Sequence, residues 1–387
     1  MPGASPTLER EWSLLKAACT FNHRHEEIES LRARLRGPIR WKLLFDLAEA
    51  HGVQPLLHRL LSGVRDLVPP GEMLALDRAN QTNLHKALFL SRELIRVSDC
   101  LQAIGIDVLP YKGVALAETV YGDMVLRQAG DIDLLIRPHD LVRARMALEE
   151  LGYQPHLPLS EQQERAYLKS GYECAFDSAA GRNLLEVQWA IQPRFYAVDF
   201  DMEALFQRAV SVTVAGRSMK APSVEDLFLV LSLHAAKHVW GRLIWLSDLA
   251  RMVKMPSLDW TFIASQAWSM GVVRILRVSL ILTNRLVGTP VPTTADASLP
   301  TDPQAQCLAN RIQDQIINGA TVDAESFAYF KLMLQLRERR SDRLRFLTRL
   351  AFTPGPSEWA AIRFPEPLFP LYRLVRLSRL AARLVGA

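Results

Sequence analysis

A pair of carboxylates stands at the head of an otherwise apolar run in RQAGDIDLLIRP, residues 127–138. Side chains alternate across a β-strand, so Asp131 and Asp133 share one face while apolar side chains occupy the other. The two acids lie about 7 Å apart along such a strand. Carboxylate oxygens are the ligands that hard divalent cations prefer, and burying two bare charges would be costly. The spacing therefore indicates a candidate site for Mg²⁺ or Mn²⁺.

A third acid, Glu186, lies in NLLEVQWAI, residues 183–191, with apolar neighbours on the opposite face of the predicted strand. Three acids on adjacent strands suit a two-metal site, in which the ions activate an attacking oxygen and stabilise a leaving one. A D-x-D pair also occurs by chance in many chains. In that second interpretation Asp131 caps the start of the strand, and Asp133 pairs with a basic residue such as Arg127.

The elements that must position these acids follow from hydrophobic spacing. Residues 7–104 show the three- and four-residue steps of helices. A short apolar strand at 106–111 leads through a Lys-Gly turn into a short helix that Gly122 closes. Another helix is predicted at 138–151. Residues 172–191 contain two alternating runs around a Ser-Ala-Ala-Gly turn, which predicts a β-hairpin.

Helical spacing returns beyond about residue 222, where Ser223 is predicted to cap a helix together with Asp226. The Pro-rich stretch at 288–303 is predicted to be a loop. We therefore predict an α+β fold in three parts: an N-terminal helical region (1–104), an α+β core (105–215) and a C-terminal helical domain with a basic tail (216–387).

Composition and cysteine usage argue against several classes of protein. Hydrophobic residues make up 49% and charged residues 22% of the chain, which is typical of globular proteins and not of disordered ones. The four cysteines are far apart and form no CxxC pair, so neither a thiolate zinc site nor a disulfide framework is expected. No uncharged apolar run reaches 18 residues and the first residues lack a leader pattern, so we expect a cytoplasmic protein.

The segment YKGVALAETVYGDMVLRQAGDIDLLIRPHDLVRARMALEELGY, residues 111–153, resembles the core of the nucleotidyltransferase (DNA polymerase beta-like) superfamily. The resemblance is to its bacterial branch of uncharacterised nucleotidyltransferase-like proteins. That superfamily has a glycine at a strand-to-helix turn, a short helix, two acids separated by one apolar residue, and a third acid on a later strand. The resemblance implies a small mixed β-sheet core with flanking helices.

The resemblance also implies an activity, which is metal-dependent transfer of an NMP group from an NTP to an acceptor hydroxyl with release of pyrophosphate. Mg²⁺ or Mn²⁺ would be the cofactor. The expected roles are catalysis and metal binding for Asp131, Asp133 and Glu186, and nucleotide binding for Lys112, Gly113 and Arg127. The acceptor stays open between a small molecule, a sugar, a peptide and a nucleic acid.

This sequence departs from the superfamily pattern at two points. Val114 replaces the hydroxyl residue that usually follows the glycine, and seventeen residues separate Gly113 from Asp131. Backbone N–H groups at a helix N-terminus still offer contacts to phosphate. The departures leave a second function open, in which the chain keeps the fold, has lost the chemistry and serves as a binding or scaffold protein in a biosynthetic cluster. For Arg127 the alternative to nucleotide binding is a surface salt bridge.

Two histidines on a predicted helix also have spacing that could ligate a metal. His234 and His238 are four residues apart on one helix face, and Asp248 follows ten residues after the second. No Glu follows His234 as an H-E-x-x-H motif requires, and Trp240 and Trp245 lie nearby. A packed polar cluster is therefore favoured over a metal site. The intervening lysine at 237 is a further candidate for a phosphate contact.

The basic character of the chain is local to its last part. Residues 331–387 hold twelve Lys and Arg against four Asp and Glu, a net charge of +8 in a chain of +5. The final helix is predicted to place leucines on one side and arginines on the other, namely Arg373, Arg376, Arg379 and Arg383. Docking of the leucine face onto the helical domain is favoured, and peripheral contact with an anionic membrane is the alternative. Aromatic residues are sparse among the basic ones, so nucleic acid is the weakest partner option.

Overall fold

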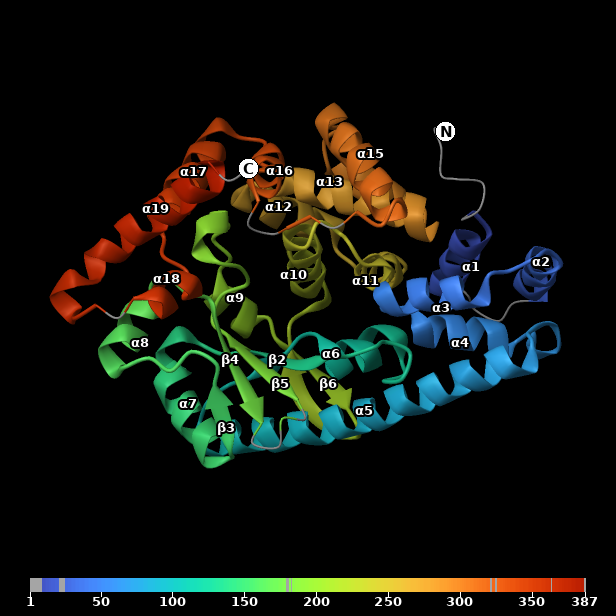
Figure 1. Ribbon diagram of the computed structural model, residues 1–387, viewed down its shortest axis with the longest axis horizontal. Helices are drawn as coiled ribbons and strands as arrows, with labels where there is room; N and C mark the ends of the chain where they lie inside the picture. Colours follow the sequence, from blue (N-terminus) through green and yellow to red (C-terminus); the bar gives the residue numbers. More distant parts are fainter. Residues whose placement is uncertain are drawn as a thin grey trace.

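The protein has an α+β fold in which helices surround a mixed five-stranded sheet (Figure 1). The predicted fold class is therefore confirmed. The computed structural model describes residues 9–20, 25–178, 181, 183–320, 322–323, 326–362 and 364–385.

The main sheet has the strand order β1-β2-β5-β4-β3, with β2 and β5 parallel and the other pairs antiparallel. Its strands are β1 Leu109–Pro110, β2 Asp131–Leu135, β3 Tyr153–Pro155, β4 Glu173–Ser178 and β5 Leu184–Gln188. The predicted hairpin is the β4–β5 pair; Ala179 and Ala180 of its turn lie outside the described residues. A second sheet pairs β6 Val210–Val214 with β7 Arg217–Ala221. The predicted boundary after residue 215 falls in the turn of this second hairpin, and the division into three parts stays a prediction.

The predicted strand-turn-helix unit is present between β1 and β2. It consists of α6 Gly113–Leu116, continued by the π-helical turn η2 Ala117–Tyr121. Gly122 follows in the left-handed conformation at φ 70°, as expected of a residue that closes a helix. The other helices of the core are α7 Leu141–Glu150, α8 Glu161–Tyr167 and α9 Met202–Gln207, with the short turn η4 Arg194–Tyr196 before α9.

The N-terminal helices are α1 Glu9–Thr20, α2 His25–Leu35, α3 Trp41–Ala50, α4 Gln54–Ser62 and α5 Pro70–Ala103. The 34 residues of α5 span about 50 Å, and this helix runs along one side of the molecule from the N-terminal helices to the sheet (Figure 1). Its first turns bury Met73 and Leu76 with the N-terminal helices, while Leu90, Leu94 and Leu101 pack under the sheet. This helix therefore connects two hydrophobic cores.

The C-terminal helices are α10 Val224–Lys237, α11 Leu243–Val253, α12 Trp260–Met270, α13 Val273–Leu282, α14 Thr293–Ser298, α15 Pro303–Ile317, α16 Phe327–Gln335, α17 Arg340–Phe352, α18 Pro356–Ala361 and α19 Tyr372–Val385. The predicted cap of α10 is confirmed, because the Ser223 hydroxyl accepts from the backbone N–H of Asp226 at 3.2 Å. The predicted loop at 288–303 is wrong in part because it contains α14, which starts after Pro292.

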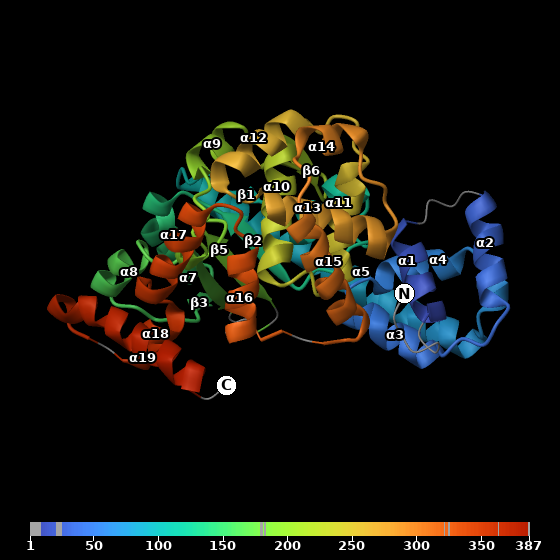
Figure 2. The same cartoon turned by 90° about the horizontal axis from the view of Figure 1, so that it is seen from above.

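The two faces of the main sheet belong to different cores. Ile132 and Leu134 of β2, with Leu185 and Val187 of β5, pack against α5 and α7 in one core. The other face of β2 ends in Leu135, which belongs to a larger core shared by α1–α4 and the C-terminal helices. Figure 2 shows α1–α4 at one end of the molecule and α17–α19 at the other, with helices α10–α15 between them. Helix α1 packs against α11, which joins the N-terminal and C-terminal helices in this core. The acid-bearing face is therefore directed toward the second core.

The last helix differs from its predicted packing. Leu374 is 60% exposed, whereas Arg376 is 4% exposed and pairs with Glu358 of α18 at 3.5 Å. The prediction that one leucine face docks is therefore wrong in part, because a buried ion pair takes the place of a leucine contact. The side chain of Arg383 lies outside the described residues. Among the helices described, none combines the length and apolar character needed to cross a bilayer.

Candidate active site

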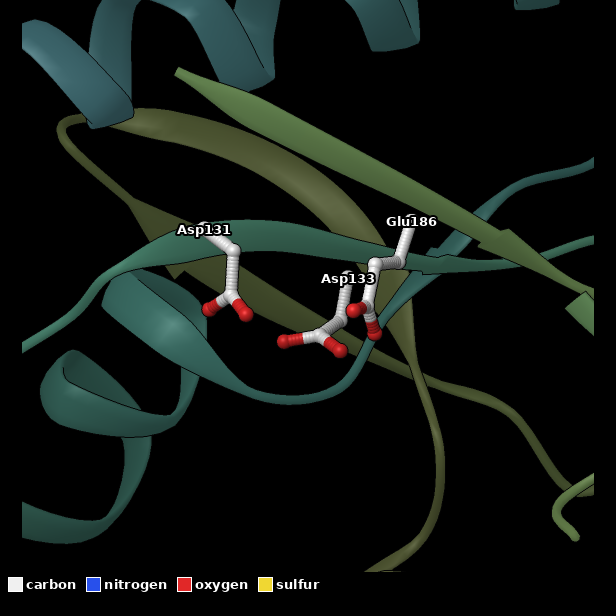
Figure 3. Close-up of side chains that lie close together, drawn as sticks. All are labelled: Asp131, Asp133 and Glu186. Carbon is white, nitrogen blue, oxygen red and sulfur yellow. The ribbon is translucent and has the colours of Figure 1, made fainter. Parts of the chain in front are cut away.

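Three carboxylates meet on one face of the neighbouring strands β2 and β5 (Figure 3). Asp133 lies opposite Glu186 in the parallel register. Asp131 precedes Asp133 by two residues, which returns its side chain to the same face. One oxygen of each carboxylate lies within 4.8 Å of the other two. In the described part of the chain, these acids form the one group of three or more His, Cys, Asp or Glu side chains close enough to share a metal ion.

The donor set of this group fits a hard divalent cation. Mg²⁺ and Mn²⁺ favour anionic oxygen ligands, and all three groups are carboxylates. Two of them are directly opposite each other, so the strand register itself holds the donor oxygens together. The structure thus brings together the three residues that the sequence predicted to be metal ligands.

Burial and mutual repulsion disfavour the charged forms of these acids. Burial raises the pKa of Glu186 to about 8, and the Asp133 carboxylate adds to the shift. Burial, followed by repulsion from Asp133, also raises the pKa of Asp131. The surroundings of these carboxylates therefore do not fully stabilise three negative charges, and a bound cation would stabilise them.

Lys112 supplies the closest positive charge to the group. Its Nζ donates to Oδ1 of Asp133 at 2.7 Å, and the two side chains are 10% and 2% exposed. Burial alone would lower the pKa of Lys112, but attraction to the Asp133 carboxylate raises it above its ordinary value. The predicted pairing of Asp133 with a basic residue is thus present, with Lys112 in place of Arg127. The ammonium of Lys112 balances one carboxylate in this structure.

Gly113 lies where the turn after β1 passes close to β2. Its φ is 57°, in the left-handed region that favours glycine. A Cβ at this position would lie 3.1 Å from the backbone oxygen of Asp131, tighter than side chains normally approach. The next residue, Val114, is 2% exposed and packs in the core under the sheet. Val114 therefore faces away from the carboxylates, while Lys112 and Gly113 line the cavity above them.

This cavity, of about 440 Å³, lies between the acid-bearing face of the sheet and helices α10 and α11. Lysines and arginines line it from both sides, namely Lys112, Arg127, Lys237 and Arg242. Nζ of Lys237 donates to the Tyr172 hydroxyl at 2.7 Å, and burial lowers the pKa of this lysine. Arg242 is exposed and forms no ion pair with any residue that the structure describes. An acidic floor thus faces a basic wall, which suits a metal–triphosphate complex.

Arg127 lines the cavity and is held by a buried carboxylate from the other side. Its Nε donates to Oδ1 of Asp248 at 3.0 Å and its Nη2 to Oδ2 at 3.0 Å. The Tyr121 hydroxyl donates to the same carboxylate at 2.7 Å. The alternative interpretation of Arg127 as a surface salt bridge is confirmed for the ion pair and wrong for its location, because the two partners are 8% and 0% exposed. This ion pair fixes the segment before β2 to helix α11.

The turn between α10 and α11 places two cations beside the cavity. Val239 and Trp240 adopt φ values of 53° and 50°, a left-handed conformation that costs about 1–3 kcal/mol for each non-glycine residue. Trp240 is fully buried and its Nε1 donates to the Ser279 hydroxyl at 2.9 Å. This buried anchor stabilises the reversal that brings Lys237 and Arg242 to one cavity.

His234 and His238 line the same cavity but form an aromatic cluster with Trp245. The ring centroids of the two histidines lie 5.4 and 5.2 Å from that of Trp245. Burial, reinforced by nearby lysines, lowers the pKa of His234 well below its ordinary value, so this imidazole is neutral. Asp248, the third candidate ligand, is bound to Arg127 instead. The structure supports the packed polar cluster and not the histidine metal site.

Several cavity residues were missed by reasoning from the sequence. Glu173 starts β4 and lies opposite Gln188, whose amide donates to Glu173 at 3.3 Å and to Glu186 at 3.1 Å. The Tyr111 hydroxyl donates to the same Gln188 at 2.6 Å. The hairpin register could have identified Glu173, because it shares a face with the acids. Arg242 carried no such signal, since only the fold brings it to the sheet.

A comparison with known protein families establishes the relationship of the chain. Residues 37–288 match the family of uncharacterised nucleotidyltransferases. The chain belongs to this family. The matched region of the chain contains the main sheet, α10 and α11, and therefore both walls of the cavity. Neither a curated protein nor a solved structure matches the chain.

Proposed function

We propose that the protein transfers an NMP group from an NTP to an acceptor hydroxyl and releases pyrophosphate, in a reaction that requires Mg²⁺ or Mn²⁺. One observation carries this proposal. Three carboxylates with close oxygens, of which Asp133 is buried and the other two are half-buried, form the floor of a cavity whose opposite wall is basic, in a chain of a nucleotidyltransferase family.

Asp131, Asp133 and Glu186 would hold the divalent cations. When bound, these cations would neutralise triphosphate charge and favour the in-line displacement at the α-phosphorus. The register of β2 and β5 already orients these carboxylates as metal ligands, so binding of the cations needs no rearrangement of the backbone.

The basic residues of the cavity orient the triphosphate. Lys237 and Arg242 face the carboxylates from the α10–α11 segment, where they can contact phosphate oxygens. Lys112, Gly113 and Arg127 line the opposite side and are the proposed nucleotide contacts of the core. Because Lys112 already pairs with Asp133, we propose that it turns to a phosphate once a cation has replaced it at this carboxylate.

The reaction itself exchanges one phosphorus–oxygen bond for another. The acceptor oxygen forms a bond to the α-phosphorus, and the bond from this phosphorus to the oxygen that bridges to the β-phosphorus breaks. Pyrophosphate leaves with that bridging oxygen. The acceptor proton passes to a carboxylate of the floor, for which Glu186 is the proposed group, or to water.

The experiment incubates the protein with NTPs labelled in the α- or the γ-phosphate, Mg²⁺ and an extract of its source cells. We expect label from the α-phosphate, and not from the γ-phosphate, in an acceptor product. Transfer by Asp131→Asn/Asp133→Asn should fall at least about 100-fold, because each change removes a charge that positions the cation. The matched control Glu150→Gln/Asp314→Asn neutralises two exposed acids and should transfer normally.

Two results would contradict the proposal. Equal transfer by the Asp131→Asn/Asp133→Asn variant would exclude these carboxylates from the reaction. Absence of NTP binding by the wild-type protein would instead favour the scaffold function, in which the family fold is kept without the chemistry.

A further inference from the structure

A second large cavity, the basic groove, lies beside the candidate active site. It has a volume of about 730 Å³ and runs between the end of α8, η4 and the helices α17 to α19. Figures 1 and 2 show these helices at the same end of the molecule. Its charged lining residues are Lys169, Arg194, Arg349 and Arg373. Of the described residues that line it, none is acidic.

Most of the positive charge in the basic groove is not neutralised. Lys169 and Arg373 are exposed, and neither forms an ion pair with any described residue. Arg194 donates to the backbone oxygen of Lys169 at 2.7 Å, which fixes the guanidinium without removing its charge. Arg349 alone has a carboxylate partner, Asp199, at 2.6 Å. Three uncompensated cations around one concavity attract an anion with several negative oxygens.

The basic groove also has an apolar side. Phe352 is 52% exposed there, and Trp359 and Phe369 complete this wall, with their rings in edge-to-face contact at 5.4 Å. An apolar wall beside cations suits a ligand that joins phosphate to a less polar body.

Two short chain segments connect the basic groove to the active-site cavity. Ser170 lines the groove, and Tyr172, two residues later, lines the cavity. Ile191 lines the cavity, and Arg194, three residues later, lines the groove. Because two residues span at most about 7 Å, the groove and the cavity adjoin along these segments.

We propose that the basic groove binds the phosphate-bearing part of the acceptor, so that the acceptor hydroxyl reaches the carboxylates. The acceptor is then a phosphorylated compound, with its phosphate at Lys169, Arg194 and Arg373. The role as acceptor site rests on the proposed function. The binding of phosphate in the groove does not.

The test measures binding of inorganic tripolyphosphate by calorimetry in EDTA, on the full wild-type chain. EDTA removes metal-dependent binding, and the carboxylates of the active site, left in place, repel a metal-free polyanion. Adding Lys169→Gln/Arg373→Gln should weaken binding at least about tenfold, because two of three free charges are lost. The matched pair Arg92→Gln/Lys220→Gln removes two exposed charges elsewhere and should leave the affinity unchanged.

A second arm links the groove to transfer. In the otherwise wild-type protein, Lys169→Gln/Arg373→Gln should lower transfer of α-label to the extract while leaving the affinity for Mg²⁺–NTP unchanged. If neither the wild type nor the groove variant transfers label, the proposed function fails, and the tripolyphosphate titration still shows whether the groove binds phosphate. No tripolyphosphate binding, or equal binding by the groove variant, would overturn the inference. The same titrations are repeated with vesicles of anionic phosphatidylglycerol. If the groove variant loses binding to these vesicles but binds tripolyphosphate like the parent protein, the inference is overturned in favour of a membrane contact.

Discussion

At the scale of single residues, little positive charge contacts the three carboxylates directly. Lys112 is the one cation within hydrogen-bonding distance of the three carboxylates among the described residues, and it contacts only Asp133. Glu186 lies opposite Asp133, and burial, followed by repulsion from Asp133, raises its pKa to about 8. A divalent cation must therefore displace the proton of Glu186 before all three carboxylates can bind it.

This competition predicts a pH dependence of metal affinity. Below about pH 8 the proton on Glu186 competes with the cation, so the affinity for Mn²⁺ should rise about tenfold per pH unit and level off above pH 8. The Glu186→Gln variant has no proton to displace, so its weaker affinity should vary less over the same range. Titration of Mn²⁺ between pH 6 and 9 measures both slopes. A flat wild-type profile would show that Glu186 is not a ligand.

The Lys112–Asp133 ion pair predicts a second effect. Lys112→Met leaves the buried Asp133 carboxylate without its partner, and breaking a buried pair costs about 3–5 kcal/mol. We expect a lower Tm for the metal-free variant, and a larger rise of Tm with Mn²⁺ than in the wild type, because the cation replaces the lost charge. Lys220→Met, at an exposed position, is the control. An equal response of variant and wild type to Mn²⁺ would contradict the site.

At the scale of elements, the register of β2 and β5 and the turn before α6 build the site. The period of two along each strand predicted which face carries the acids, and the hairpin and the strand-turn-helix unit followed from the same patterns. Glu173 could have been found from the register of the predicted hairpin, which places it opposite Gln188. The sequence could not predict α14, because this helix lies in a Pro-rich stretch that is typical of a loop.

Gly113 and Gly122 form a natural pair for testing the turn. Both have a left-handed φ, 57° and 70°, so an alanine at either position costs about 1–2 kcal/mol of backbone strain. Only at Gly113 would the added Cβ approach the backbone of β2, while nothing lies within 4 Å at Gly122. We expect both Gly→Ala variants to lose stability and only Gly113→Ala to bind Mn²⁺–NTP more weakly, by about tenfold. Equal affinities would show that the turn is remote from the nucleotide.

At the scale of the whole molecule, the cavity lies where two cores meet. The first core contains the sheet, α7 and the second half of α5, and the other joins α1–α4 to the C-terminal helices. The sequence predicted three successive parts, but it could not show that the first and last share a core. Long-range packing of helices leaves no local pattern. For the same reason Arg242 and the basic groove were not foreseen.

This arrangement predicts that a nucleotide stabilises both walls of the cavity together. Hydrogen exchange with Mn²⁺ and α,β-methylene analogues of the NTPs should slow in residues 127–134 and also in 230–246, because the ligand contacts both. Helix α15 lies outside the cavity and is the internal control. Slower exchange in the first segment alone would show that α10 and α11 do not contact the nucleotide.

The most direct test of the central claim is the binding of Mn²⁺, followed by the EPR signal of the free ion. The account predicts saturable binding by the wild-type protein that tightens when an α,β-methylene NTP analogue is present. Binding should weaken at least about 100-fold in Asp131→Asn/Asp133→Asn and stay unchanged in Glu150→Gln/Asp314→Asn. Equal affinity of the wild type and the Asp131→Asn/Asp133→Asn variant for Mn²⁺ would contradict the account.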